Sequence, residues 1–405
     1  MGFSLYVHVP FCVRICTYCD FPRVQLAGAT PAGATPAGAT PAGATPGAGE
    51  PEATFAAMIS SLGSLPAAMR TQPVDTVFFG GGTPSCVQPG LIAGILRTAR
   101  DLFPFSDNAE ISLEANPEDV TPAWIRTMSE AGVNRFSLGV QSFACAGTLG
   151  RRHTPQRAID AVGELRAGGV TNLNLDLMFA LPDQGPSELD RDLDELIALS
   201  PEHVSCYGLT LEPDTPLGRD YAAGRFRFPD DETWLKLYRT VQDRLEGAGY
   251  NQYEISNWAR TGMECRHNLL IWEGADYLGI GPAAVSRWKR WRWTEPANPM
   301  EYRRLVEGCR WPQEGPSPWA AAADTVDDEG ADLETLLTGT RLLRGFDLGR
   351  LHGRLLEDCI CDLRTKGFLW QTGDRVGLTR PGLPVADSIL AQLVDALRSS
   401  EESVR

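Results

Sequence analysis

The chain has 405 residues, of which 43% are hydrophobic and 22% charged, as is typical of a soluble globular protein large enough for about two domains. Its net charge of −15 argues against a general nucleic-acid-binding protein. No apolar run approaches about 18 residues, so the sequence predicts no transmembrane helix. The first residues lack the features of a signal peptide, and the 10 cysteines are irregularly spaced, so we expect a reducing, cytoplasmic location.

The first predicted strand, Leu5–Val9, leads directly into three cysteines with C-x3-C-x2-C spacing, namely Cys12, Cys16 and Cys19. Three thiolates can hold three irons of a [4Fe–4S] cluster, because soft sulfur ligands suit such clusters. The fourth iron is then free to bind a small molecule. The alternatives are three buried structural cysteines or a zinc site that lacks a ligand. Zinc motifs usually add a second ligand pair, and none follows at a suitable spacing.

Residues 27–46 are four copies of Ala-Gly-Ala-Thr-Pro. The unit has no large apolar residue, so it cannot bury enough surface to offset the entropy that ordering would remove. The composition therefore predicts a disordered loop stiffened by proline. Because the repeat lies between the cysteines and the next predicted helix, we interpret it as an insertion without a catalytic role.

Beyond the repeat, predicted helices and strands alternate. The further strand candidates are residues 76–79, 111–115, 135–140, 173–178 and 204–209, and the helix candidates are 53–69, 90–102, 122–131, 158–167, 187–199 and 232–246. Alternation of this kind predicts parallel strands joined by helical crossovers. Six such units are fewer than the eight of a complete barrel.

Glycine or polar residues stand at the ends of these strands, where a parallel barrel places its chemistry. They are Gly81, Gly82 and Thr83 after the second strand, Glu114 at the end of the third, Gln141 after the fourth and Asp176 in the fifth. Each alone is compatible with a structural function, as a tight turn, an ion pair or a hydrogen-bonded core group. Their recurrence from strand to strand favours a binding site.

The cysteine spacing, with Tyr18 before the last cysteine, resembles the motif of radical S-adenosylmethionine (SAM) proteins. The segment from Tyr6 to Cys12, YVHVPFC, is similar to the opening of the family of oxygen-independent coproporphyrinogen III oxidase-like proteins, which includes the HemW-type haem chaperones. This resemblance covers the chain outside the repeat. It implies a partial (βα)6 TIM-like barrel of the radical SAM type, followed by a small winged-helix-like C-terminal domain.

The resemblance also implies the cofactors. In that superfamily SAM chelates the open iron of the [4Fe–4S] cluster, and an electron from the cluster cleaves it to a 5′-deoxyadenosyl radical. The residues that would contact SAM here are Tyr6, Phe21, Gly81, Gly82, Thr83, Glu114, Gln141, Arg151 and Asp176. The stretch between Gln141 and the arginines is shorter than the usual pattern, so Arg152 is an alternative to Arg151. No catalytic residue is assigned.

We expect three segments: a radical SAM barrel over residues 1–250, a barrel-completing segment over 251–315, and a helical or winged domain over 316–405. In the second segment, CRHNLLIW resembles an H-N-x-x-Y-W motif associated with haem binding, with Ile271 in place of the usual tyrosine. Val285 likewise stands where the family usually has histidine. His267 is the candidate haem ligand, because neutral imidazole commonly binds haem iron. The alternative is a histidine that caps a turn or fills a core gap.

The remaining predictions concern local structure after residue 286. The stretch 287–293 alternates cations with indoles and predicts a strand with one packed aromatic face and one basic face, suited to haem propionates. Residues 319–332 resemble a linker or a helix start. Helices are predicted over 333–343, 348–363 and 383–397, and a hairpin over 368–378.

Two functions compete. The first is a haem chaperone that carries a SAM-bound cluster and passes haem to an acceptor protein, with a membrane-associated acceptor among the options. The second is coproporphyrinogen III dehydrogenase, which acts by radical oxidative decarboxylation in haem biosynthesis. That enzyme has a fourth cysteine where this chain has Phe21, and a longer N-terminal extension, and both differences favour the chaperone. A third interpretation, a barrel used only for interactions, does not explain the cluster cysteines. The acceptor and the electron donor are not identified by the sequence.

The repeat generates the first testable prediction. Deleting residues 32–46 should leave the melting temperature and cluster content nearly unchanged, because loop-closure entropy varies slowly with length and the segment contributes no apolar core. Thermal unfolding of the wild-type and shortened chains measures this directly. A large fall in melting temperature would show that the repeat is ordered.

Overall fold

The computed structural model describes residues 2–26, 50–145, 147–309, 311–312, 315–352 and 356–402. The Ala-Gly-Ala-Thr-Pro repeat lies outside these ranges. Within them, no helix combines the length and the apolar character that a membrane crossing requires.

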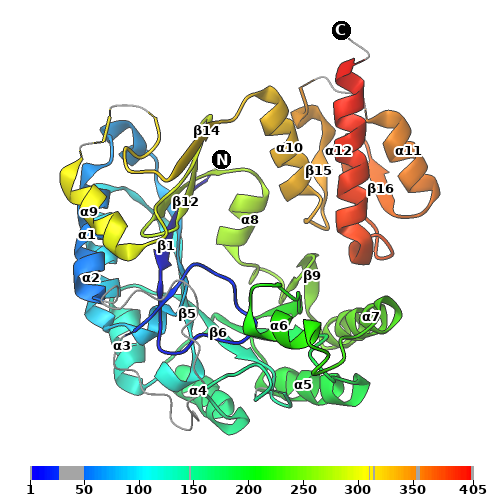
Figure 1. Ribbon diagram of the computed structural model, residues 1–405, viewed down its shortest axis with the longest axis horizontal. Coiled ribbons are helices and arrows are strands. Elements are labelled where there is room, and N and C mark those ends of the chain that lie inside the picture. Colours follow the sequence, from blue (N-terminus) through cyan, green and yellow to red (C-terminus); the bar gives the residue numbers. More distant parts are fainter. Residues whose placement is uncertain are drawn as a thin grey trace.

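Six parallel strands, paired in chain order, form the centre of the molecule (Figure 1). They are β1 (Phe3–Val9), β4 (Val74–Gly81), β5 (Phe105–Ala115), β6 (Arg135–Gln141), β7 (Leu173–Phe179) and β8 (His203–Gly208). The helices that follow them are α1 (Pro51–Ser64), α2 (Pro89–Leu102), α3 (Pro122–Glu130), α4 (Pro155–Ala167), α5 (Pro186–Leu199) and α7 (Asp231–Gly247). Figure 1 shows these helices around the outside of the curved sheet. The predicted partial (βα)6 barrel is confirmed.

The residues of β1 show why the sheet adopts this arrangement. Leu5 and Val7 are buried in the main apolar core, as strands covered by helices require. The alternate residues are polar, and the Ser4 hydroxyl accepts a hydrogen bond of 2.8 Å from Thr76 of the neighbouring strand. Because side chains alternate across a strand, the inner side of the barrel is polar while its outer side packs against the helices.

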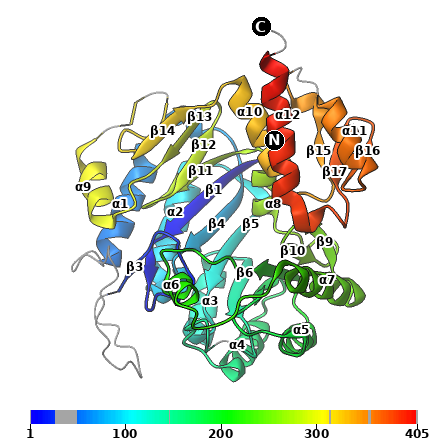
Figure 2. The ribbon, with the colours of Figure 1, turned by 45° about the vertical axis from the view of Figure 1, so that its right-hand side comes forward.

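The sheet extends beyond the predicted strands on both sides (Figure 2). Next to β1 lies β11 (Asp276–Ile280), also parallel, followed by the antiparallel strands β12 (Val285–Trp288), β13 (Trp291–Thr294) and β14 (Ala322–Thr325). Next to β8 lie the antiparallel strands β10 (Asn257–Ala259) and β9 (Asn251–Glu254). Among the described residues, the sheet therefore has twelve strands and stays open, with β14 and β9 at its edges.

The prediction of a single strand over residues 287–293 is wrong. The segment is a hairpin of β12 and β13, which turns at Lys289, where φ is +53°. Trp288 and Trp293 are buried, as expected for the aromatic face. Arg287 and Arg292 stand opposite each other and both pair with Glu334, so these guanidinium groups already have an anionic partner.

The C-terminal part contains three helices around a small sheet, as a winged-helix-like domain requires (Figure 2). Its elements are α10 (Asp328–Gly339), β15 (Phe346–Asp347), α11 (Glu357–Thr365), β16 (Leu369–Thr372), β17 (Arg375–Leu378) and α12 (Ala386–Glu402). The hairpin predicted over 368–378 corresponds to β16 and β17. The helix α9 (Pro299–Gly308) precedes this part and packs on α1.

Two local predictions in this part need correction. The helix predicted over residues 348–363 is confirmed only in its second half: α11 begins at Glu357, and Leu348–Arg350 form a short 3-10 turn. The Asp347 carboxylate accepts a hydrogen bond from the N–H of Gly349, and this local bond favours the short turn. Residues 322–325, predicted within a linker or helix start, form the edge strand β14, and α10 begins only at Asp328.

Candidate radical SAM site

The three cysteines lie on the loop that follows β1. Cys12 belongs to the short strand β2 (Phe11–Cys12), which pairs with β3 (Val24–Gln25) and so folds the loop back on itself. All three cysteines are free thiols. They line one cavity of about 400 Å³ at the carboxyl ends of the barrel strands. The structure therefore brings together the three sulfurs that the sequence singled out.

The glycine run after β4 holds this loop in place. The N–H of Gly82 donates to the Val9 carbonyl at 2.8 Å, and the N–H of Thr83 donates to the Phe11 carbonyl at 2.7 Å. A Cβ atom on Gly82 would lie only 2.6 Å from the Phe11 oxygen. Gly81 has φ +105° and lies against the His8 ring. These glycines line the cavity, and the N–H groups of Gly82 and Thr83 bind the end of β1 and the start of the cysteine loop.

Two carboxylates line the same cavity, Glu114 at the end of β5 and Asp176 in β7. Asn174 donates to the Asp176 carboxylate at 2.7 Å. Burial and the charge of Asp176 raise the pKa of Glu114 to about 8, and burial also raises the pKa of Asp176. Two carboxyl groups that resist ionisation form a site that a cationic ligand would stabilise.

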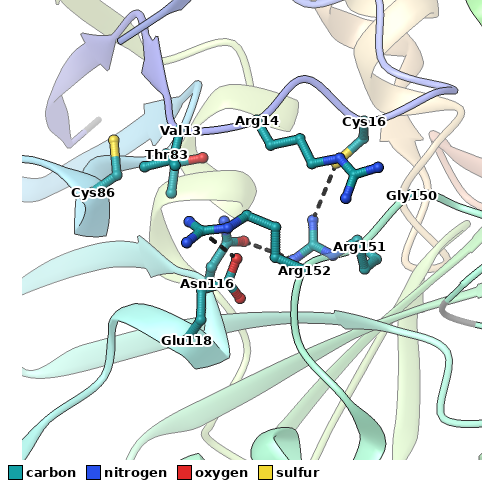
Figure 3. Close-up of a pocket in the computed structure, with 10 residues that line it drawn as sticks. All are labelled: Val13, Arg14, Cys16, Thr83, Cys86, Asn116, Glu118, Gly150, Arg151 and Arg152. Atoms are coloured by element: carbon teal, nitrogen blue, oxygen red, sulfur yellow. Dashed lines mark hydrogen bonds and ion pairs between the residues drawn. The ribbon is translucent and has the colours of Figure 1, made fainter. Parts of the chain in front are cut away.

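Arg151 lies in the cavity and Arg152 does not. One terminal nitrogen of Arg151 lies 3.6 Å from Cys16 Sγ, and the other donates to Asn116 Oδ1 at 2.7 Å (Figure 3). The second nitrogen also donates to the Gly139 carbonyl at 2.5 Å. Figure 3 shows the neighbouring pocket, which Arg152 and Glu118 line together with Cys16 and Arg151. Arg152 points to Glu118, at 3.8 Å. Of the two alternatives that the sequence left open, Arg151 is the one that lines the cavity with all three cysteines.

Gln141 and Phe21 also line the cavity. Gln141 ends β6 with φ +71°, a left-handed conformation that a non-glycine residue rarely adopts and that often marks functional sites. Phe21 is 61% exposed, at the end of the cysteine loop. Sequence reasoning missed Asn116, Tyr207 and other lining residues. Asn116 could have been found because it lies two residues after Glu114 in the same strand end.

Tyr6 and His267 do not line this cavity. The hydroxyl group of Tyr6 lies 3.1 Å from His8 Nδ1, within the polar interior. His267, in α8 (Arg266–Trp272), is 2% exposed and stacks on Phe78 with ring centroids 5.0 Å apart. Its Nδ1 lies 2.8 Å from the hydroxyl of Thr76, near the start of β4, so His267 sits toward the opposite end of the barrel from the cysteines.

His267 nevertheless has an unusual environment. Burial lowers the pKa of His267 to about 3, so the imidazole is neutral. Its Nε2 is buried and has no hydrogen-bond partner among the described residues. A neutral ring with one free nitrogen has the protonation state of a haem ligand, but it is not exposed to one in this arrangement.

A small apolar cluster, separate from the main core, packs over the cysteine loop. It consists of Leu149, Met178, Leu181, Leu209 and Leu217. The half-buried ring of Tyr18, next to Cys19, packs against it. The first turn of α6 (Pro216–Ala222) is tied to the loop by a 2.9 Å hydrogen bond from the Leu217 N–H to the Thr17 carbonyl. The segment after β8 therefore helps to position the cysteines.

A partial parallel barrel with three free cysteines at its carboxyl end defines the radical SAM class. Consistently, the family model described as radical SAM superfamily matches residues 6–196, which include the second half of β1, the cysteine loop and the strands from β4 to β7. A solved structure of Escherichia coli coproporphyrinogen III oxidase, HemN, described as a radical SAM enzyme, matches with a TM-score of 0.77. The match covers 97% of this chain and 90% of that one at 19% sequence identity, and shows that the two share a fold.

Sequence comparison with curated relatives identifies the family within the radical SAM superfamily. The haem chaperone HemW of Mycobacterium tuberculosis is 36% identical over 397 residues, which cover 97% of this chain and 95% of the relative. HemW of Bacillus subtilis is 31% identical, with 97% of this chain and all of the relative covered (100%). HemW of Escherichia coli is 37% identical, with 69% of each chain covered. The chain belongs to the haem chaperone HemW family.

The carboxylate pair generates the second testable prediction. The folded state binds the Glu114 proton more tightly than an unfolded chain, whose glutamate has the ordinary pKa of 4.5. This contribution to stability is complete below pH 4.5 and is lost as the pH rises toward 8. Between these limits, the cluster-free wild type should lose roughly 4 kcal/mol of stability relative to Glu114→Gln, at about 1.4 kcal/mol per pKa unit.

Urea denaturation of both proteins at several pH values, under anaerobic reducing conditions, measures this difference. Glu130→Gln, at an exposed position on α3, is the matched control and should follow the wild-type pH profile. Parallel profiles for the wild type and Glu114→Gln would contradict the assignment of a raised pKa to this group.

Proposed function

We propose that the chain is a cytoplasmic haem chaperone that carries a [4Fe–4S] cluster with SAM at its open iron, binds haem, and passes it to an acceptor protein. The observation that carries the proposal is the meeting of three free cysteines with Glu114 and Arg151 in one cavity, in a chain of the HemW family.

The donor set fits the cluster. In the described part of the chain, no three His, Cys, Asp or Glu side chains form a group that could hold a single metal ion. A cluster does not need such convergence, because each thiolate binds a different iron. Cys12, Cys16 and Cys19 would be these ligands, and the Thr83 hydroxyl, 3.4 Å from Cys12 Sγ, would remain beside one of them. When bound and reduced, the cluster would supply one electron to SAM.

The rest of the cavity suits SAM. The ammonium and sulfonium groups of SAM are cationic. Glu114 and Asp176 provide two carboxylates, and among the described residues neither forms a direct ion pair with a cation. Binding of a cation would favour the charged forms of both groups. Gln141 offers an amide donor and acceptor for the ribose or the base. Phe21 and Thr83 would line the same space.

The haem proposal uses His267 as an axial ligand. Its neutral imidazole and free Nε2 support this role. Its burial adds a requirement, because α8 must shift before a haem iron can reach Nε2. Arg290 has no ion pair among the described residues and remains a candidate for a haem propionate, whereas Arg287 and Arg292 would first have to leave Glu334.

The alternative is oxidative decarboxylation of coproporphyrinogen III. The HemN fold likeness is compatible with both functions, because 19% identity shows shared architecture only. Phe21, which stands at the position of the dehydrogenase's fourth cysteine, favours the chaperone. The proposal also includes an electron donor and a haem acceptor. A membrane-associated protein is one option for the acceptor.

The third testable prediction concerns the cluster ligands. After anaerobic reconstitution with iron and sulfide, changing Cys12, Cys16 or Cys19 to Ala should abolish the broad visible absorption of the cluster. Cys86→Ala is the sharpest control, because its sulfur lies 3.5 Å from the Phe11 carbonyl, next to the cysteine loop. That variant, and alanine at any of the remaining six cysteines, should keep the absorption. Loss of the cluster absorption in Cys86→Ala would contradict the assignment of three cysteine ligands.

The fourth testable prediction separates chaperone from enzyme. The purified protein should bind about one haem per chain and should not convert coproporphyrinogen III under anaerobic reducing conditions with excess SAM. His267→Ala should weaken haem binding or shift the Soret band while leaving the cluster spectrum unchanged. The control His352→Ala changes a half-exposed histidine of the C-terminal part.

Two results would overturn parts of this proposal. Unchanged haem binding by His267→Ala would remove that residue as the ligand. Steady formation of protoporphyrinogen IX by the wild type would replace the chaperone with the alternative enzyme.

A further inference from the structure

Arg151 is the only cation within hydrogen-bond distance of a cysteine sulfur among the described residues. Its Nη1 lies 3.6 Å from Cys16 Sγ (Figure 3). Its Nη2 is held by Asn116 Oδ1 at 2.7 Å and by the Gly139 carbonyl at 2.5 Å. Two bonds to the ends of neighbouring strands therefore fix the guanidinium group in position and aim its remaining terminal nitrogen at the sulfur.

The surroundings of Arg151 provide no carboxylate partner. Among the described residues, none lies within ion-pair distance of it, and the nearby Glu118 pairs with Arg152 and His153 instead. The Nε atom of Arg151 is buried and has no hydrogen-bond partner in the part of the chain that the structure describes. A cation removed from water needs a compensating anion, and the thiolate of a metal-bound Cys16 would be that anion.

We propose that Arg151 is a positioning residue that raises the reduction potential of the cluster through its N–H···S contact with Cys16. This inference rests on the proposed function, in which Cys16 is a cluster ligand. It assigns Arg151 an action that is separate from any contact with SAM.

The physical reason is the charge that reduction adds. One electron enters the cluster, no bond is formed or broken, and the negative charge on its sulfur ligands increases. A charge-assisted hydrogen bond to a ligand sulfur stabilises the more negative state. Hydrogen bonds to the sulfurs and local charge are known determinants of cluster potentials. Because Asn116 and Gly139 hold the guanidinium group in advance, little reorganisation accompanies the electron.

The effect of Arg151 on the reduction potential can be measured separately from SAM binding in a sample to which no SAM has been added. If Arg151 serves only to bind SAM, its replacement leaves the potential of the SAM-free cluster unchanged. If it acts on Cys16, the change is present before SAM is added. Dithionite supplies the electron in such a titration, and a one-electron carrier protein would supply it in the cell.

The experiment is a redox titration of the reconstituted full-length protein without SAM, followed by visible absorption and electron paramagnetic resonance. Arg151→Gln should shift the midpoint potential to a more negative value, and Arg151→Lys, which keeps the charge but not the fork geometry, should shift it less. Asn116→Ala, which removes one anchor of the guanidinium group, should also give a smaller negative shift. The matched control Arg152→Gln should keep the wild-type value.

The outcomes are distinct. A wild-type potential in SAM-free Arg151→Gln would overturn the inference and leave the proposed function intact. If Arg151→Gln takes up no cluster, the potentials of Arg151→Lys and Asn116→Ala test the inference instead. A wild-type potential in both variants would overturn the inference. A shift of equal size in Arg152→Gln would assign the effect to general charge and also overturn it. A wild type that takes up no cluster would overturn the proposed function, and this inference with it.

Discussion

The site depends on how closely the end of β4 approaches the cysteine loop. The backbone bonds from Gly82 to Val9 and from Thr83 to Phe11 hold the loop over the barrel. The same contact excludes a side chain at Gly82, where a Cβ would lie 2.6 Å from a carbonyl oxygen. A larger residue would lift the loop and carry Cys12 away from the Thr83 hydroxyl. The glycines therefore fix the position of the cysteine loop, and the position of the loop determines the shape of the cavity.

The polar interior of the barrel changes character from one end to the other. Near the strand starts, His203 is hydrogen-bonded to Asn174 at 2.6 Å and to Tyr253 at 2.8 Å, whereas the Nε2 of His267 has no partner among the described residues. At the carboxyl end, Glu114 and Arg151 line the cavity without direct ion-pair partners among the described residues. A buried guanidinium group without an anionic partner is costly. A carboxyl group with a raised pKa is ionised more readily beside a cation. This end of the barrel is therefore suited to a ligand that carries both charges.

Local sequence was sufficient for the elements that local interactions determine. All six core strands were predicted, because buried β-prone runs and helical segments alternate clearly. The seventh parallel strand, β11, was missed because its pairing with β1 joins segments far apart in the sequence. The prediction of one strand over residues 287–293 is wrong for a related reason, because the alternation of Arg and Trp does not indicate the turn at Lys289. The choice between Arg151 and Arg152, and the burial of His267, required three-dimensional placement.

The small apolar cluster around Leu217 has a dynamic consequence. Its five buried residues pack against Tyr18, next to Cys19, whereas Phe11 at the start of the cysteine loop belongs to the much larger main core, as the barrel strands do. Opening free energies follow the number of buried apolar contacts in a region. We therefore expect α6 and the part of the loop around Tyr18 to open at a lower free energy than Phe11 and the barrel strands, which belong to the main core.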